Sequence, residues 1–456
     1  MAKAKTVYVC QQCGSVRSRW MGRCTDCGEW NTFVEERADS SEVSPAAPAS
    51  TRNRPVRLGD VCAEDARRLP SGVAEFDRAV GGGLVVGGVV LLGGEPGIGK
   101  STLTMQVLSG LAAQGRSVLY VTGEESASQV AMRADRIGGE GAQEIAILAT
   151  TQLEDVETSW SEHRPEVVVI DSVQTLRSHD LSSTAGSVAQ VREVAARLTE
   201  RAKVDSISMV LIGHVTKEGS LAGPKVLEHL VDTVLSFEGD RTHAFRMVRA
   251  VKNRFGPAHE TGVFEMLSEG LRDVPDPSAM LLSERPVDAS GSVVVPTTEG
   301  SRCFLVEVQA LVAPSRLGAS RRVASGLDAS RMAILLAVIE RKAEIQVLDQ
   351  DVFASLTGGI RLGERGLDLG LAIAVVSSFR DRALPPNWAV FGEVGLAGEV
   401  RAVAHPERRI AETAKLGFSN VILPKATAER LGDAPPGLRL HPVAGLSEAF
   451  ETAFHS

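Results

Sequence analysis

The stretch GEPGIGKS, residues 94–101, has the glycine spacing and the lysine–hydroxyl pair of a phosphate-binding loop. It lies between the apolar run VVLLG, which is typical of a strand, and a helical pattern, as this motif requires. Its glycines let backbone N–H groups face phosphates, and the following helix adds its positive end. We predict that Lys100 contacts the β and γ phosphates of ATP and that Ser101 binds Mg²⁺. The predicted nucleotide-binding residues are Gly94, Glu95, Pro96, Gly97, Ile98, Gly99, Lys100, Ser101 and Thr102.

Acidic residues that follow two strand-like runs could complete a site for ATP hydrolysis. VVVIDS ends its apolar run on Asp171, whose carboxylate could hold the magnesium shell; an aspartate that only caps a turn is the alternative. TGEES places Glu124 and Glu125 after SVLYV, at the strand end that faces a nucleotide in such sheets. We predict that Glu124 orients the attacking water. Glu125 is the second candidate, and a charge in a helix's first turn is the alternative for both. His214, which ends LIGH, could sense the γ-phosphate or be a hydrogen-bonded structural histidine.

Four cysteines near the N-terminus have the spacing of a metal site. Each C-x-x-C can place two thiolates on one tight turn, and two such turns close a tetrahedral site around Zn²⁺. Four sulfur ligands leave no position for a substrate, so we predict a structural zinc site; a redox dithiol is the alternative. A module of about thirty residues buries little apolar surface, so the metal would supply most of its folding energy. The predicted ligands are Cys10, Cys13, Cys24 and Cys27.

The segment VKNRFGP, residues 251–257, ends the alternating run FRMVRAVK, which predicts a strand. Lys252 and Arg254 stand beside Phe255 and Gly256, and we expect the glycine to allow a chain reversal. A solvated turn is the simplest interpretation, and the rest of the chain decides whether the two cations do more.

The elements that must position these residues fall into blocks. Residues 1–34 hold the cysteines, and residues 35–56, rich in Ser, Pro and Ala, predict a flexible linker. From 57 to 275 short apolar strands alternate with helical patterns, which predicts βαβ units and a mainly parallel sheet. A mixed α/β block, residues 280–456, follows the Pro-marked segment DVPDPSA. The predicted fold class is therefore α/β.

Composition limits the class of protein. A chain of 456 residues with 43% apolar content can form about three globular domains. It contains no run of 18 apolar residues and no charged-then-apolar leader, so we expect a cytoplasmic protein with no membrane contact. Its net charge of −8 requires that any nucleic-acid contact come from local basic patches. Cys62 and Cys303 have no partner pattern and are expected to be packing residues.

With CQQC, CTDC, GEPGIGKST, VVVIDSVQT and KNRFG in this order, the chain resembles the RadA (Sms) family of bacterial DNA-repair proteins along its whole length. KNRFG is the most specific element, because phosphate-binding loops are widespread. The resemblance implies a RecA-like ATPase core with an N-terminal four-cysteine zinc finger. It further implies a hexameric ring on single-stranded and branched DNA, a motor for branch migration of recombination intermediates, and a strand-exchange recombinase as protein partner.

The resemblance also suggests a role for KNRFG. In ring ATPases of the RecA type, ATP lies between subunits and cations from the neighbour stabilise charge on the γ-phosphate. By this analogy Lys252 and Arg254 act on the adjacent subunit's ATP, and Phe255 anchors the turn. Contact of KNRFG with DNA is the second interpretation, since Lys and Arg suit phosphates and Phe could stack on a base.

RecA-like motors bind DNA with loops that follow core strands, and two segments have that position. TLRSHDLSSTAGS, residues 175–187, carries Arg177, and TKEGSLAGPK, residues 216–225, carries Lys217 and Lys225. Both could contact a sugar-phosphate backbone without reading bases, and neither contains an aromatic side chain for stacking. Ordinary surface loops are the alternative.

Residues from about 280 resemble the proteolytic domain of Lon proteases, notably in LDLGLAIAVVSS and GLAGEVRAVAHPERRIAETAKLGFSNVILP. Lon-type hydrolysis needs a serine activated by a lysine. Asp368 and Glu407 occupy those two positions, so we predict a proteolytically inactive domain retained for ring assembly. A basic DNA-binding face or a salt-bridged surface could involve Arg316, Arg321, Arg322, Arg401, Arg408 and Arg409.

The sequence is thus compatible with three functions. A DNA-stimulated ATPase motor is the leading one. An ATP-switched assembly scaffold without motor activity is the second, and an ATP-dependent protease, disfavoured by Asp368 and Glu407, is the third.

Overall fold

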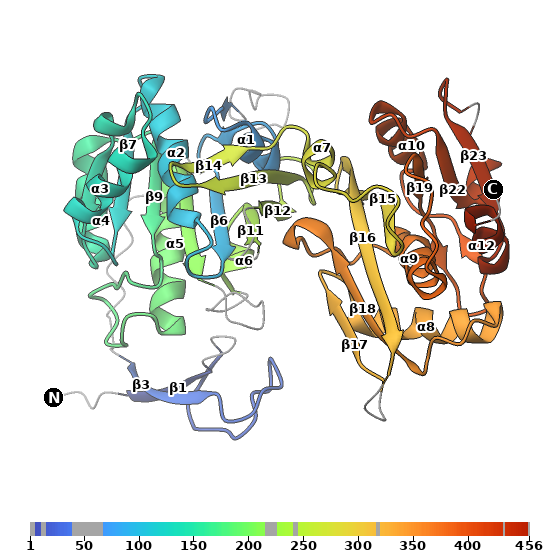
Figure 1. Cartoon of the computed structure of the whole chain (residues 1–456). Coiled ribbons are helices and arrows are strands. Elements are labelled where there is room, and N and C mark those ends of the chain that lie inside the picture. The colour runs from blue at the N-terminus through green and yellow to red at the C-terminus, as the bar shows by residue number, and fades with distance from the viewer. Residues whose placement is uncertain are drawn as a thin grey trace. The chain divides into compact units, whose positions relative to one another are not determined.

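The computed structural model describes residues 5–10, 15–38, 67–214, 226–239, 245–315, 320–431 and 434–454. Contacts within the chain divide it into two units, Met1–Glu238 with Met247–Asp273, and Gly239–Arg246 with Val274–Ser456 (Figure 1). Both units combine helices with sheets, as the predicted α/β class requires. None of the helices within these ranges is long and apolar enough to cross a membrane.

The cysteine-rich segment forms a ribbon of three short strands in the order β2-β1-β3. Strand β1 (Lys5–Cys10) pairs antiparallel with β2 (Val16–Arg17) and with β3 (Phe33–Ala38). Strand β3 extends past the predicted end of the zinc module, so residues 35–38 of the predicted linker are strand. Among the residues of the ribbon that the structure describes, Cys10, Cys24 and Phe33 form the buried cluster, and Tyr8 and Met21 pack against it. So small a core leaves the fold dependent on another source of stability.

The larger sheet has nine strands in the order β14-β13-β12-β11-β6-β10-β9-β7-β8. Six of them are parallel, and the antiparallel strands extend one side of the sheet. The parallel strands are β6 (Val89–Gly94), β7 (Val118–Thr122), β8 (Ala146–Ala149), β9 (Val167–Asp171), β10 (Ser208–His214) and β11 (Thr233–Glu238). The others are β12 (Phe245–Asn253), β13 (Thr261–Leu267) and β14 (Gly270–Asp273).

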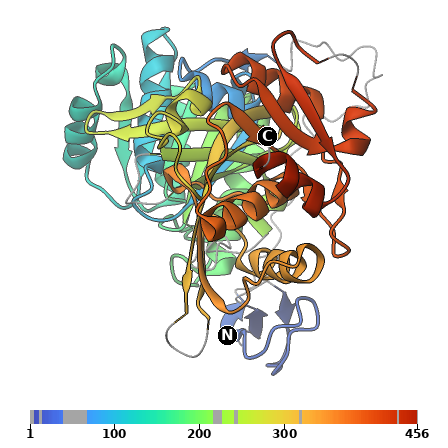
Figure 2. The ribbon, with the colours of Figure 1, turned by 45° about the vertical axis from the view of Figure 1, so that its right-hand side comes forward.

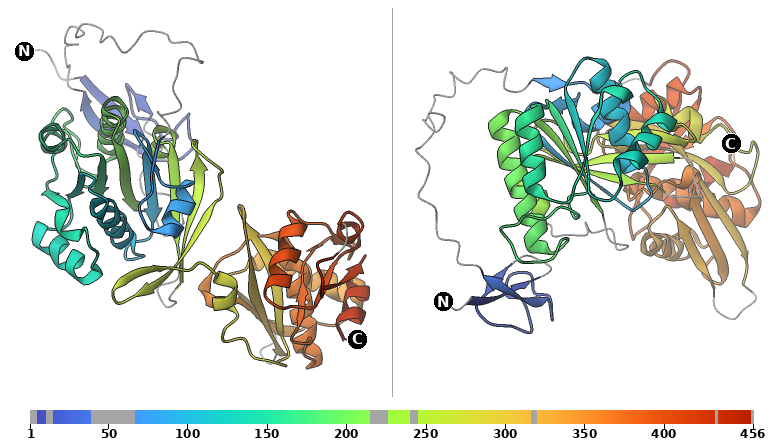
Figure 3. Two further views of the ribbon diagram at one scale, coloured as in Figure 1. Left: turned by 90° about the horizontal axis from the view of Figure 1, so that it is seen from above. Right: turned by 90° about the vertical axis from the view of Figure 1, so that its left-hand side faces the viewer.

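Helices cover both faces of this sheet (Figure 3). Helices α1 (Ala74–Val80), α2 (Lys100–Ala113) and α3 (Ala127–Ile137) pack on one face, where Val90 and Leu92 of β6 point. Helices α4 (Leu153–His163), α5 (Val188–Asp205) and α6 (Val226–Leu230) pack on the other, with Val89 and Leu91. Burial on both faces explains why these strands read as continuous apolar runs.

The second unit contains a seven-stranded mixed sheet in the order β17-β18-β16-β15-β19-β22-β23. Figure 2 shows this unit, coloured mainly from orange to red, from a second side. Its strands are β15 (Ser292–Glu299), β16 (Arg302–Pro314), β17 (Arg322–Ser325), β18 (Gln350–Leu356), β19 (Trp388–Val390), β22 (Asn420–Pro424) and β23 (Arg439–Val443). A separate two-stranded sheet joins β20 (Glu393–Val394) to β21 (Val400–Arg401).

Helix α9 (Asp368–Arg380) is the central helix of this unit, since it is buried from Asp368 through Ser377. It contacts β15 and β16, and it also contacts α8 (Ala329–Ala343) and α12 (Leu446–Phe454). The remaining helices are α7 (Pro277–Leu281), α10 (Pro406–Lys415) and α11 (Lys425–Ala428).

Candidate nucleotide-binding site and metal centre

The phosphate-binding loop joins the end of β6 to the start of α2. Gly97 and Gly99 have φ angles of 77° and 117°, which side-chain-bearing residues rarely adopt. A Cβ atom on Gly99 would also lie 2.6 Å from Met266 Cε. The first helical residue is Lys100, so the unpaired N–H groups of the helix start, at Ser101 and Thr102, belong to the same loop. The loop is therefore shaped to receive an anion.

The ammonium group of Lys100 is buried inside this loop. Its Nζ donates hydrogen bonds to the carbonyl oxygens of Gly94, at 2.8 Å, and Glu95, at 3.0 Å. Burial lowers the pKa of Lys100 to about 8, although the nearby carboxylates of Asp171 and Glu124 oppose this shift. The lysine is thus held where phosphate oxygens could replace the carbonyl oxygens as its partners.

Asp171 and Glu124 lie on neighbouring strand ends. Asp171 ends β9 and pairs in register with Thr122 of β7, and the Tyr120 hydroxyl donates to its carboxylate. Ser172 Oγ donates to Glu124 Oε1 at 2.6 Å. The structure therefore brings Lys100, Glu124 and Asp171 to one edge of the sheet, where parallel strands end.

The two glutamates of TGEES have different surroundings. Glu125 forms an ion pair with Arg133, whereas Glu124 is exposed and contacts Ser172 beside Asp171. These contacts favour Glu124 as the group that meets water. The sequence did not indicate the polar contacts that Tyr120 and Ser172 make in this site. A tyrosine in an apolar run such as SVLYV is usually interpreted as a buried core residue.

His214 pairs through its backbone with Gly94, and its side chain lies outside the described atoms.

KNRFG lies at the opposite edge of the same sheet. Strand β11 runs parallel to β6 with Thr233 beside Val90, and β12 returns antiparallel with Asn253 beside Thr233. Val90 is four residues before Gly94, or about 13 Å along the strand at 3.3 Å per residue. The structure therefore does not bring Lys252 and Arg254 to the phosphate-binding loop of their own chain.

A buried carboxylate anchors Arg254. Asp232 Oδ1 lies 3.3 Å from both Arg254 Nη1 and Lys203 Nζ, and Asp232 Oδ2 accepts the Val89 N–H at 3.2 Å. The Asp232 side chain is only 5% exposed, whereas that of Arg254 is 53% exposed. Asp232 therefore holds one end of the guanidinium group, while the Arg254 side chain stays accessible to solvent. No sequence pattern pointed to Asp232.

Lys252 is held by backbone oxygens. Its Nζ donates to Glu228 O at 2.6 Å and to Val231 O at 2.7 Å, around the end of α6. Burial lowers the pKa of Lys252, and the charge of Arg254 adds to this effect. A β-bulge at Val251 separates this lysine from the regular part of β12.

The turn after β12 differs from the sequence expectation. Gly256 does not have a left-handed φ angle; His259 has one instead, at 70°. Asn253 Oδ1 accepts the N–H of Phe255 at 3.0 Å, so the asparagine side chain holds the turn. Phe255 is 40% exposed, and its ring lies over Gly88, just before β6.

The thiols of Cys10, Cys24 and Cys27 converge, with all Sγ atoms within 4.8 Å of one another. The Cys10–Cys27 Sγ separation is 3.7 Å. Zinc–sulfur bonds of about 2.3 Å in a tetrahedron require sulfur atoms roughly 3.8 Å apart, so the donor set fits Zn²⁺. The fourth predicted ligand, Cys13, lies outside the described residues. Burial raises the pKa of the half-buried Cys303 thiol to about 12, so this cysteine stays protonated at neutral pH.

The first predicted DNA loop is partly ordered by a buried amide. Gln190 Nε2 donates to the carbonyl oxygens of Ser178 and Leu181, while Arg177 is exposed. The second predicted loop, residues 216–225, lies outside the described ranges.

Asp368 and Glu407 stand at the two positions where the resemblance to Lon proteases predicts a serine and a lysine. The buried carboxylate of Asp368 pairs with Arg331 through two hydrogen bonds, and Arg331 also donates to Val394 O at 2.6 Å. Glu407 is exposed in the first turn of α10. Ser377 Oγ donates to Arg382 O at 2.6 Å, so this serine has a structural role.

The predicted basic face is wrong for Arg409. This residue is fully buried, and its guanidinium contacts Glu364 and the ring of Phe391. Arg321 pairs with Asp351, and Arg401 with Glu399, so these two belong to salt-bridged surface. Arg316 lies outside the described residues.

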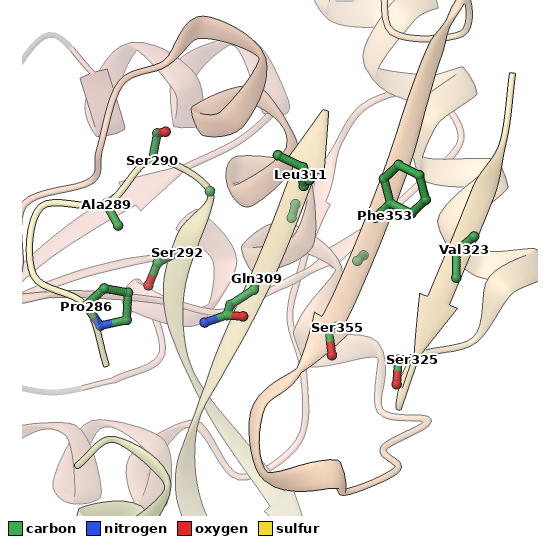
Figure 4. A pocket seen from close by; sticks show the side chains of 13 residues that line it. Pro286, Ala289, Ser290, Ser292, Gln309, Leu311, Val323, Ser325, Phe353 and Ser355 are labelled. Carbon is green, nitrogen blue, oxygen red and sulfur yellow. The ribbon is translucent and has the colours of Figure 1, made fainter. Parts of the chain in front are cut away.

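A cavity of about 370 Å³ opens on the sheet of the second unit. Leu311, Phe353 and Val323 line it from three adjacent strands (Figure 4). It contains none of the predicted site residues.

Comparisons with known proteins agree with this geometry. Residues 52–220 match the AAA domain family, and residues 8–35 match the rubredoxin metal binding domain. The chain is 44% identical to the DNA repair protein RadA of Bacillus subtilis over 457 residues, covering 99% of both chains. It is 48% identical to that of Pseudomonas aeruginosa over 456 residues, and 45% identical to that of Streptococcus pyogenes serotype M6 over 456 residues, each covering both chains fully. These comparisons support an ATP-binding domain and a zinc ribbon.

The pKa of Lys100 predicts how ATP affinity changes with pH. Below about pH 8 the lysine is charged in the free protein; above it, ATP binding must also bind a proton. We expect the dissociation constant for ATP to rise by up to about tenfold per pH unit above pH 8, measured by titration calorimetry from pH 7 to 9.5. The Lys100→Arg variant, which stays charged, should bind ATP with little dependence on pH. A flat profile in the unsubstituted chain would contradict this role of Lys100.

Removal of zinc should unfold the ribbon alone, because the buried cluster of its described residues is too small to stabilise it. Hydrogen exchange after chelation should show lost amide protection in β1 and β3 and unchanged protection in β6 and β9. Retained protection in the ribbon would exclude the four-cysteine site.

Proposed function

Because the chain belongs to the RadA family of bacterial DNA-repair proteins, we propose that it is a DNA-dependent ATPase of recombinational repair. We propose further that it is a ring-forming motor on single-stranded DNA that promotes branch migration of recombination intermediates. The main support for a ring is the position of KNRFG, which lies at the end of the sheet opposite its own phosphate-binding loop. If a cation there acts on a nucleotide, that nucleotide is held by another subunit; contact of KNRFG with DNA is the alternative.

Each residue at the nucleotide edge has a chemical task. Lys100 contacts the β and γ phosphates, Glu124 orients the attacking water, and the Asp171 carboxylate belongs to the magnesium shell. Mg²⁺, when bound, offsets charge on the phosphates. Ser172 positions Glu124, and Tyr120 fixes the Asp171 carboxylate.

Arg254 and Lys252 supply positive charge to the neighbouring subunit's γ-phosphate in this proposal. Arg254 keeps Nη1 beside Asp232 and contacts the phosphate with other donors of its guanidinium group, while Lys203 also neutralises the buried Asp232. Lys252 exchanges carbonyl oxygens for phosphate oxygens. The partners that we propose are single-stranded and branched DNA, further copies of the chain in a hexamer, and a strand-exchange recombinase.

Steady-state ATP turnover with and without circular single-stranded DNA tests this function. DNA should stimulate turnover, and the stimulation should fade as salt rises, because phosphate contacts release counterions. Slow turnover that ignores DNA at every salt concentration would contradict the motor and support an ATP-switched scaffold.

A mixing experiment tests action between subunits. Arg254→Ala should bind ATP normally and lose about 10³-fold in turnover, the usual scale for such a finger. Lys100→Ala should be inactive because it lacks the phosphate cation. Mixed rings of the two variants contain interfaces with one intact lysine and one intact arginine, so some turnover should return. Confirmed mixed rings without any recovery would exclude the role in trans.

Substitution of Asp232 tests the anchor in the same assay. Asp232→Asn should lower turnover by about 10- to 100-fold at unchanged ATP affinity, because a displaced Arg254 is poorly aligned. The matched control is Asp205→Asn, which removes an exposed ion pair with Arg201 on α5. Equal effects of the two substitutions would reduce Asp232 to a structural residue.

A further inference from the structure

The cysteine ribbon exposes two large aromatic side chains. Trp20 is 52% exposed and Trp30 is 67% exposed, although burial of an indole is strongly favourable. The other two tryptophans of the chain, Trp160 and Trp388, are buried at 1% and 6% exposure. The ribbon therefore presents apolar rings that its own small core does not use.

The two rings gather around Gly22. A Cβ atom built on Gly22 would lie 3.7 Å from Trp20 Cη2 and 3.9 Å from Trp30 Cζ3, so both six-membered rings border the same point. Trp20 Nε1 donates to Phe33 O at 3.2 Å, which ties one edge of that ring to β3. The orientation of Trp20 is thus set before any ligand arrives.

Cations accompany the rings. Trp30 pairs with Arg23 across an antiparallel bridge, and the Arg23 guanidinium lies 5.8 Å from the Trp30 ring centroid. Arg23 Nε donates to Gly28 O at 2.9 Å, which holds the guanidinium in place. Arg19 is exposed one residue before Trp20. Asp26 and Glu29 of the same ribbon are exposed too, so the positive charge is confined to the two arginines near the rings.

We propose that Trp20 and Trp30 form a platform on which bases of single-stranded DNA stack, with Arg19 and Arg23 beside the phosphates. Stacking on aromatic rings next to cations binds single strands without regard to sequence. Both predicted DNA loops lack aromatic residues, so the ribbon supplies a stacking surface that they do not. The inference rests on the proposed function and assigns its single-strand contact to the zinc module.

Fluorescence of the full-length chain gives a direct readout. Since Trp160 and Trp388 are buried, quenching of tryptophan emission by an oligothymidylate reports contact with Trp20 and Trp30. We expect quenching that saturates with the oligonucleotide and that weakens in the Trp20→Ala and Trp30→Ala variants.

Affinity measurements on the same variants complete the test. Fluorescence anisotropy with a labelled oligothymidylate should show affinity about 5- to 100-fold weaker for each alanine variant, and near-normal affinity for Trp30→Phe, which keeps a ring. Val34→Ala is the matched control, because Val34 is a 50% exposed apolar residue of the same ribbon. Zinc content, measured for every variant, shows that the ribbon is folded.

The outcomes separate this inference from the proposed function. If DNA stimulates turnover of the unsubstituted chain while zinc-loaded alanine variants keep full DNA affinity, the platform is wrong and the motor stands. If the unsubstituted chain shows neither DNA stimulation nor DNA binding, both proposals fail. Absence of tryptophan quenching in a complex that anisotropy detects would overturn the platform even if the variants lose zinc.

Discussion

The direction of the strands in the large sheet is the constraint on which the nucleotide site depends. Because β6, β7 and β9 are parallel, their carboxyl ends meet at one edge and bring together a lysine, a glutamate and an aspartate from distant parts of the sequence. The same constraint sends the antiparallel strand β12 back to the other edge. The predicted nucleotide site thus lies at one end of the strands of this sheet, and the two cations lie at the other end.

Buried or half-buried carboxylates pair with arginines in both units, with different results. Asp232 neutralises Lys203 and a half-exposed Arg254, so its arginine remains accessible. Asp368 and Glu364 instead pair with Arg331 and Arg409, which are largely or fully buried. A buried ion pair with no exposed member holds neighbouring segments together and offers little to a ligand. The second unit therefore has a structural ion pair at Asp368, the position where the sequence resemblance to Lon proteases would place a nucleophile.

The ribbon shows how a very small module can present side chains to solvent. In the part of the ribbon that the structure describes, the buried cluster contains two cysteines and one phenylalanine, so metal ligation would take the place of a hydrophobic core. Two of its indole rings are consequently available at the surface. A module stabilised by metal ligation can expose aromatic rings that a core-stabilised domain of this size would need to bury.

The sequence alone determined the α/β class, the phosphate-binding loop and the two cysteine pairs, because each depends on local spacing or on the alternation of apolar segments. It also located Asp171 and Glu124, since residues that end apolar strands meet at one edge of a parallel sheet. Only the tertiary structure decided that KNRFG lies away from its own loop, that Asp232 anchors Arg254, and that Arg409 is buried. These facts depend on strand order and on pairing between residues far apart in the chain, which no local pattern records.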